Sequence, residues 1–288
     1  MDRFHGNAKV GKGEYFVAEA DESDSSFHHL RPKYAVVTNV EMEHMDHYGS
    51  LDDIKQSYRK FIGNLKPGGK VFFCRDDRNI IDMLEGYKGK ASSYGFDDKA
   101  DIYARDIVMK EFATSFECVY HKRAIGRVEL RIPGRHNVLN ALAAILTGLN
   151  IGIKFETIAA SLKEFRGAKR RFQLKADSGG VMVIDDYAHH PTEIRAVIDA
   201  CKNWNGKRVI AVFQPHRYSR VRSLLDDFVN CFKGVDKLIL TDIYAASEKP
   251  IPGVSSKKLC ENIRRGGHND VVLMKKEKIV DHLLKTLS

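Results

Sequence analysis

The sequence has 288 residues, and its 47 Lys and Arg exceed its 38 Asp and Glu, giving a net charge of +9. Its 43% hydrophobic and 30% charged residues are typical of a globular protein and exclude a disordered or fibrous chain. Because no apolar run approaches the ~20 residues that cross a bilayer, and residues 1–10 contain no apolar signal core, we expect neither a membrane span nor a secretory signal.

The five cysteines are scattered and form no CxxC pair. This pattern predicts reduced, buried thiols in a cytoplasmic protein rather than a disulfide framework or a zinc ribbon. The positive charge fits either nucleic acid or a phosphorylated metabolite. Basic residues are interleaved with acids, and neither an RNP-like aromatic string nor a Cys/His finger spacing occurs, so we expect no nucleic-acid partner.

Short apolar runs alternate with helical patterns, which predicts an α/β fold. In the first part of the chain we expect strands at Tyr15–Ala20, Tyr34–Val40 and Lys70–Cys74, a helix over Leu51–Leu65, an antiparallel excursion from Ile102 to Ile132, and helices near Asn137–Leu149 and Phe155–Lys163. This part is expected to form one domain, residues 1–165.

The composition shifts around Phe165–Arg171, and we expect a second domain over residues 166–288. Four apolar runs alternate there with four helical patterns, which predicts a Rossmann-like, doubly wound parallel sheet with ligands at the carboxyl ends of its strands. The expected strands are Val181–Ile184, Arg208–Phe213, Lys237–Thr241 and Val271–Met274, and the expected helices are Thr192–Cys201, Ser223–Cys231, Ser256–Ile263 and Glu277–Leu287.

Polar residues cluster where the predicted strands end. Four carboxylates crowd residues 19–24, and a second run of acids and histidines follows at residues 41–47. Oxygen-rich clusters of this kind suit Mg²⁺ bridged to nucleotide phosphates, although a solvated acidic loop or a capping loop would have the same composition. Asn137, after Pro133-Gly134, is placed to start a helix that favours an anion or a base edge, and an ordinary helix cap is the alternative.

The second domain carries two further clusters. Asp186, His189 and His190 follow a buried strand, and the histidines are placed to donate to substrate oxygens or to relay protons. Arg217 and Arg220 are three residues apart at another strand end, where they can clamp one carboxylate. Solvent-exposed loop histidines and solvated arginines are the alternatives. We expect the strand ends of both domains to converge on a single cleft.

Seven segments together resemble the Mur ligase family: AEADESDSSF, VVTNVEMEHMDHYG, PGRHNVLNALAA, FRGAKRRFQ, DDYAHHPTEI, FQPHRYSR and DIYAASEKPIPG. In sequence, these segments are most similar to those of the members that attach L-alanine to UDP-N-acetylmuramate. The resemblance implies a partial central ATP-binding α/β domain followed by a Rossmann-like C-terminal domain. It also implies a reaction in which ATP phosphorylates the lactyl carboxylate and the alanine amine attacks the acyl phosphate.

The resemblance further implies roles for nine residues. Glu19 and His44 are expected to hold Mg²⁺, Asn137, Arg171 and Asp186 to contact ATP, His189 and His190 to act in catalysis, and Arg217 and Arg220 to bind substrate.

Family members also carry a UDP-binding domain and a phosphate loop of the form GTxGKT, and no segment here satisfies GxxxxGK[ST]. The last strands of the C-terminal domain are also expected to be missing. We therefore expect a fragment that is inactive alone, with the missing N-terminal segment as a candidate partner in trans. Two other readings stay open. A metal-dependent hydrolase would use the HMDH and DDYAHH segments, and a non-catalytic basic module would use the net charge.

Overall fold

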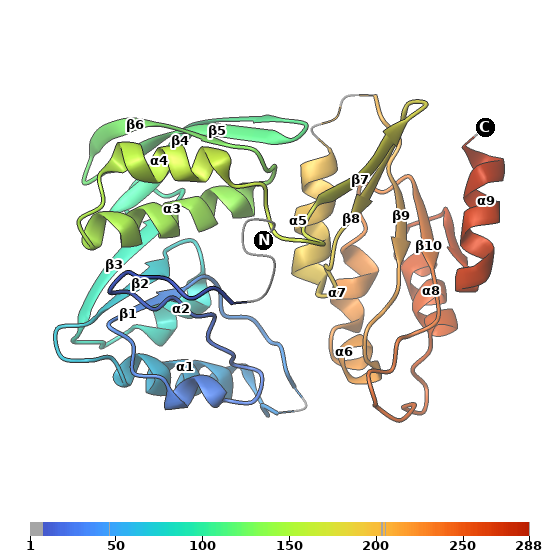
Figure 1. Ribbon diagram of the computed structural model, residues 1–288. Coiled ribbons are helices and arrows are strands. Elements are labelled where there is room, and N and C mark those ends of the chain that lie inside the picture. Colours follow the sequence, from blue (N-terminus) through green and yellow to red (C-terminus); the bar gives the residue numbers. More distant parts are fainter. Residues whose placement is uncertain (1–7, 46, 203, 205, 288) are drawn as a thin grey trace. The chain divides into compact units, whose positions relative to one another are not determined.

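The computed structural model describes residues 8–45, 47–202, 204 and 206–287 (Figure 1). The chain divides between Gly167 and Ala168 into two compact units, which we call unit 1 and unit 2. Each unit has its own cluster of buried apolar side chains.

Unit 1 is built on a six-stranded sheet in which the strands lie side by side in chain order. The strands are β1 (Tyr34–Val37), β2 (Lys70–Cys74), β3 (Lys90–Gly95), β4 (Ile102–Lys110), β5 (Ala113–Tyr120) and β6 (Arg123–Leu130). The first four are parallel, and β4, β5 and β6 are antiparallel, so the expected antiparallel excursion is confirmed. The elements α2 and β3 were not anticipated.

The helices of unit 1 are η1 (Ser26–His29), α1 (Leu51–Gly63), α2 (Arg78–Met83), α3 (Arg135–Asn150) and α4 (Phe155–Glu164). In Figure 1, α3 and α4 lie on one side of strands β1–β3, and α1 lies on the other. The Ser50 side chain caps α1 by accepting a hydrogen bond from the Asp53 N–H at 3.2 Å. Apolar side chains of α3 such as Leu142 and Ile145 are fully buried in the unit 1 core, so α3 is held by packing along most of its length.

The predicted strand at Tyr15–Ala20 is wrong. These residues belong to no strand, and the side chains of Phe16 and Val17 are 92% and 91% exposed. A strand needs a neighbour to complete its ladder of hydrogen bonds. An apolar run therefore indicates that the side chains suit a strand, but it does not show that a neighbouring strand is present to pair with it.

Unit 2 contains a parallel sheet of three strands in the order β11–β10–β9, formed by β9 (Ile210–Phe213), β10 (Lys237–Leu240) and β11 (Val271–Leu273). The fourth expected strand, β8 (Val181–Asp185), is hydrogen-bonded instead to β7 (Gln173–Ser178) in an antiparallel hairpin. The turn between them is Gly179-Gly180, with φ of 58° and 80°, which favours a tight hairpin. The pairing of β8 thus differs from the prediction of a single parallel sheet.

The helices of unit 2 are α5 (Pro191–Cys201), α6 (Tyr218–Ser223), α7 (Leu225–Asn230), α8 (Ser256–Arg265), η2 (Lys276–Lys278) and α9 (Ile279–Thr286). In Figure 1, α5 and α9 lie on opposite sides of the strands. The alternation of strands and helices confirms the α/β class. None of the helices in the described residues combines the length and apolar character needed to cross a membrane. All five cysteines are free, and four of them are buried.

Candidate functional site

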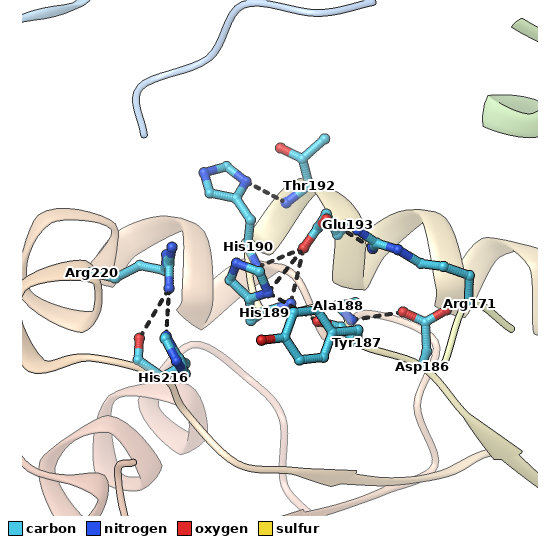
Figure 2. Close-up of polar contacts among 10 residues, drawn as sticks. All are labelled: Arg171, Asp186, Tyr187, Ala188, His189, His190, Thr192, Glu193, His216 and Arg220. Atoms are coloured by element: carbon cyan, nitrogen blue, oxygen red, sulfur yellow. Dashed lines mark hydrogen bonds and ion pairs between the residues drawn. The ribbon is translucent and has the colours of Figure 1, made fainter. Parts of the chain in front are cut away.

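The loop between β8 and α5 is organised around the Glu193 carboxylate (Figure 2). Its Oε2 accepts hydrogen bonds from the backbone N–H groups of His189 and His190 at 3.0 and 3.2 Å, and Arg171 Nη1 donates to Oε1 at 3.0 Å. The buried His190 side chain caps α5, because its Nδ1 accepts from the Thr192 N–H at 3.3 Å. The sequence H-P-T-E therefore forms a capping box, with proline in the first turn.

These contacts set the ionisation of Glu193. Burial acts most strongly and would raise its pKa. The hydrogen bonds from the His189 and His190 N–H groups and the charges of His189 and Arg171 together outweigh burial, and the pKa is lowered. Glu193 is therefore ionised at neutral pH and holds the histidine loop in one conformation.

Asp186 joins two segments of unit 2 through its carboxylate. Its Oδ2 accepts from the Phe172 N–H at 2.6 Å, and its Oδ1 accepts from the Ala188 N–H at 2.7 Å. The Arg170 guanidinium lies over the Tyr187 ring, 4.7 Å from its centroid. The segment that carries Arg171 is thereby fixed against the loop that carries the histidines.

The loop after β9 carries the two predicted arginines. Arg217 caps α6 with φ 67° and ψ 136°, a backbone conformation suited to glycine, and its N–H donates to the Tyr244 carbonyl at 2.8 Å. Arg220, one turn further on, donates through Nη1 to His216 Nδ1 at 3.0 Å and to the His216 carbonyl at 3.3 Å. Figure 2 shows the Arg220 side chain directed back toward His216.

The rings of His189 and His216 lie 5.6 Å apart, and this contact brings the loops after β8 and β9 together. His216 also stacks on Tyr244, with ring centroids 5.5 Å apart. Burial lowers the pKa of His216, and the nearby charges of Arg220, His189 and Arg217 lower it further, against an opposing effect of Glu248. His216 is therefore neutral near pH 7, with Nδ1 as the acceptor.

Sequence reasoning assigned no role to His216, Tyr244 or Glu248. Glu248 accepts hydrogen bonds from both the N–H and the hydroxyl of Ser219, with the N–H at 3.0 Å. Burial would raise the pKa of Glu248, but the Ser219 hydrogen bonds and the Arg217 charge lower it. The signal was present, since Ser219 and Glu248 both lie in segments that carry the family resemblance, but only the fold places them together.

In unit 1, the two acidic loops meet through a chain of hydroxyl and imidazole groups. The Tyr48 hydroxyl donates to the Glu22 carbonyl at 2.5 Å and lies 3.2 Å from the hydroxyls of both Ser25 and Ser57. His28 Nε2 lies 2.9 Å from the Ser57 hydroxyl. The segment after residue 19 and the segment around residue 44 are thus held side by side, although the first of them does not follow a strand.

His44 contacts Glu22 rather than Glu19. Its Nε2 lies 3.1 Å from Glu22 Oε1, and its φ of 53° is left-handed. Glu19 is exposed on the extended segment. Among the described residues no group of three His, Cys, Asp or Glu side chains is arranged to hold a metal ion. The carboxylates of Glu19 and Glu22 nevertheless fit Mg²⁺, which takes one or two protein carboxylates and obtains its other ligands from water and phosphates.

Asn137 lies in the first turn of α3, which begins at Arg135 with Gly134 as its cap. Its side-chain amide donates to the Pro133 carbonyl at 2.6 Å, which secures the entry into the helix. The Arg135 guanidinium stacks over the Phe96 ring at 4.1 Å. The described contacts of Asn137 are those of a structural cap, and its contact with ATP stays a prediction.

Each unit thus has parallel strands whose carboxyl ends carry polar loops, which is the arrangement of α/β proteins that bind ligands at strand ends. Residues 3–148 match the Mur ligase middle domain, and residues 170–288 match the Mur ligase, glutamate ligase domain. The chain belongs to the Mur ligase family.

Similar proteins include the UDP-N-acetylmuramate–L-alanine ligases of Trichlorobacter lovleyi and Solibacter usitatus, which are 45% and 46% identical over 92% of this chain. The chain spans 59% and 56% of their lengths. The crystal structure of the UDP-N-acetylmuramate-alanine ligase from Thermotoga maritima is 26% identical and superposes with a TM-score of 0.78, covering 98% of this chain and 60% of that one. The MurF ligase of the same organism, solved with ADP, shares the fold with a TM-score of 0.69 at 18% identity.

Proposed function

We propose that this chain carries the middle and C-terminal parts of an ATP-dependent ligase that joins L-alanine to UDP-N-acetylmuramate through an acyl phosphate. The observation that carries the proposal is the cluster at the strand ends of unit 2, where His189, His216, Arg217 and Arg220 come together. Such a ligase must hold a carboxylate and orient an amine, and this cluster supplies cations and neutral imidazole for both tasks.

In this proposal, Arg217 and Arg220 bind substrate carboxylate. Arg220 is already directed by His216, so its guanidinium is oriented before a ligand arrives. The depressed pKa of His216 leaves it neutral, so that it adds no positive charge that would repel an incoming ammonium group. His189 lies beside it and is held by Glu193 through its backbone N–H.

For ATP, we propose contacts from Asn137 in unit 1 and from Arg171 and Asp186 in unit 2, with Glu19 and His44 as the Mg²⁺ ligands. When bound, Mg²⁺ would neutralise charge on the transferring phosphoryl group. The Glu22–His44 contact keeps the imidazole beside the acidic segment after residue 19. The hydrogen bond from Tyr48 to the Glu22 carbonyl holds this segment next to the segment around residue 44. A cytoplasmic location is part of the same proposal.

The test is phosphate release by the purified chain with ATP, Mg²⁺, UDP-N-acetylmuramate and L-alanine. We measure it for the chain alone and with an added polypeptide that carries a UDP-binding domain and a GTxGKT loop. The expected result is release in the mixture that depends on both UDP-N-acetylmuramate and L-alanine, with omission of either as the control. Phosphate release that does not depend on L-alanine in either preparation would overturn the proposal. Rapid turnover by the chain alone would overturn the expectation that an added segment is needed.

The metal-dependent hydrolase predicts hydrolysis without ATP. The arrangement of Arg217 and Arg220 beside His216 favours the ligase, because a hydrolase built on the histidine segments gives this arginine pair no task.

A further inference from the structure

Unit 1 contains a recess that shares no residue with the clusters described above. It has a volume of about 590 Å³ and is lined by Lys110, Glu111, Phe112, Ala113, Arg131 and Arg166. Recesses of roughly 300–1,000 Å³ are the usual size for small-molecule sites. The recess lies at the antiparallel part of the six-stranded sheet.

The recess forms at the tip of the β4–β5 hairpin. Lys110 pairs with Ala113 across the two-residue turn, so Glu111 and Phe112 project at the tip. Arg131 directly follows β6, whose last residue pairs with Thr114, and the Thr114 hydroxyl donates to the Ile132 carbonyl at 3.1 Å. This hydrogen bond fixes the backbone that carries Arg131 beside the hairpin. Arg166 comes two residues after α4, which packs along β6.

The charges in this recess are unbalanced. Three cations and the single carboxylate of Glu111 line it. Within the described part of the chain, Lys110, Arg131 and Arg166 form no ion pair with a carboxylate within 4.0 Å, although Arg105, for example, pairs with Glu117. The direct partner of Glu129 is Lys163 at 2.8 Å, which lowers the pKa of Glu129 most, and Arg131 lies near Glu129 and lowers its pKa further. Like charges gathered around one recess repel each other unless an anion joins them.

We propose that this recess binds a small molecule bearing a diphosphate group. Guanidinium groups match phosphate oxygens in pairs, and a lysine ammonium adds a point charge, so the three cations suit an anion with several oxygens. The half-buried Phe112 ring provides an apolar wall for the organic part of the molecule. The site is additional to the proposed ATP contacts, since it uses none of their residues.

The probe is inorganic pyrophosphate, added to the intact chain in EDTA so that no divalent cation contributes. Binding is followed by isothermal titration calorimetry and by the backbone amide signals of Glu111, Phe112 and Ala113 in ¹H–¹⁵N NMR spectra. We expect saturable binding with shifts at these amides. Arg131→Gln and Arg166→Gln should each weaken it about tenfold, since each removes a charge-assisted contact.

Two further variants make the test specific. Glu111→Gln removes the only carboxylate among the described residues that line the recess and should tighten binding several-fold. Arg123→Gln is the matched control, because Arg123 is equally exposed on β6 but lies at its opposite end. It should leave binding unchanged. The proposal is overturned if pyrophosphate causes no saturable shift at these amides, if Arg123→Gln weakens binding as much as Arg131→Gln, or if Glu111→Gln weakens it. All of these side chains are exposed, and far-UV circular dichroism verifies that each variant is folded.

Discussion

Arg171 and Glu193 form an ion pair at 3.0 Å between the segment that opens unit 2 and the first turn of α5. The same carboxylate receives the N–H groups of His189 and His190 on its other oxygen. One acidic side chain thereby links the segment proposed to contact ATP with the loop proposed to act in catalysis. Several measurable properties of unit 2 depend on this link.

Replacing Glu193 by Ala should destabilise unit 2 by about 1–2 kcal/mol, because α5 loses its capping box. Trp204, the only tryptophan of the chain, is buried in unit 2 and reports its unfolding in urea by fluorescence. Glu193→Gln should lose less, since an amide oxygen still accepts the N–H groups. Equal losses for Ala and Gln would contradict the capping role.

Glu193 should also make unit 2 sensitive to acid. Because its folded pKa lies below its ordinary value, the stabilisation is fully present above the ordinary pKa and is lost as the pH falls through the folded pKa. Urea midpoints measured by Trp204 fluorescence from pH 7 to pH 3 should therefore fall more steeply for the native chain than for Glu193→Gln. Parallel curves would show that Glu193 titrates normally.

His216 should titrate below the ordinary histidine pKa, because burial and the charges of Arg220, His189 and Arg217 disfavour its protonated form. Its stabilising contribution is present above the ordinary pKa and disappears as the pH falls through the depressed value. In NMR titrations of the ring protons, Arg220→Gln should raise the pKa of His216. Arg222→Gln, on the exposed side of α6, is the control and should not move it.

Tyr48→Phe should destabilise unit 1 by about 1–2 kcal/mol, because the buried hydroxyls and the Glu22 carbonyl lose their shared partner. Amide hydrogen exchange around residues 22–28 should increase at the same time. Tyr34→Phe serves as the control, since the Tyr34 ring packs on Phe72 and its hydroxyl forms no described hydrogen bond. A Tyr48→Phe variant with unchanged exchange would show that the hydroxyl does not join the two segments.

In the mixture with the added UDP-binding polypeptide, Arg217→Gln and Arg220→Gln should each reduce kcat/KM for L-alanine-dependent phosphate release by about 10- to 100-fold, as expected for loss of a charged contact to carboxylate. Arg222→Gln again provides the matched control. Retained activity in both variants would remove the arginines from the substrate side of the proposed reaction.

The parts of the fold that the sequence predicts well are those in which the local pattern and the packing agree. Strands Lys70–Cys74 and Lys237–Thr241 are apolar runs buried in parallel sheets, and both occur within one residue of the expected bounds. β7 was missed because its residues are mostly polar and exposed, as an edge hairpin strand allows. The strand predicted at Tyr15–Ala20 was wrong for the opposite reason. Its side chains suit a strand, but no neighbouring strand is described that could pair with it.

The candidate site shows the same division. His189, Arg217 and Arg220 could be selected because polar residues after apolar strands mark ligand sites in α/β sheets. The partners that orient them could not, since Ser219 and Glu248 are 29 residues apart and the contact of His189 with His216 joins two different loops. Pairing across loops depends on sheet register and side-chain rotamers, which no local pattern encodes.

At Arg217 the requirements of stability and of ligand binding conflict, because the backbone conformation favours glycine while the proposed site needs the arginine charge. Its φ of 67° is a conformation that costs a side-chain-bearing residue about 1–3 kcal/mol and a glycine little. Glycine at this position would relax the chain and make unit 2 more resistant to denaturation, while deleting the charge at the strand end. Selecting variants for heat tolerance alone would therefore favour loss of this arginine, and a screen for robust versions of the protein has to score ligand binding alongside survival.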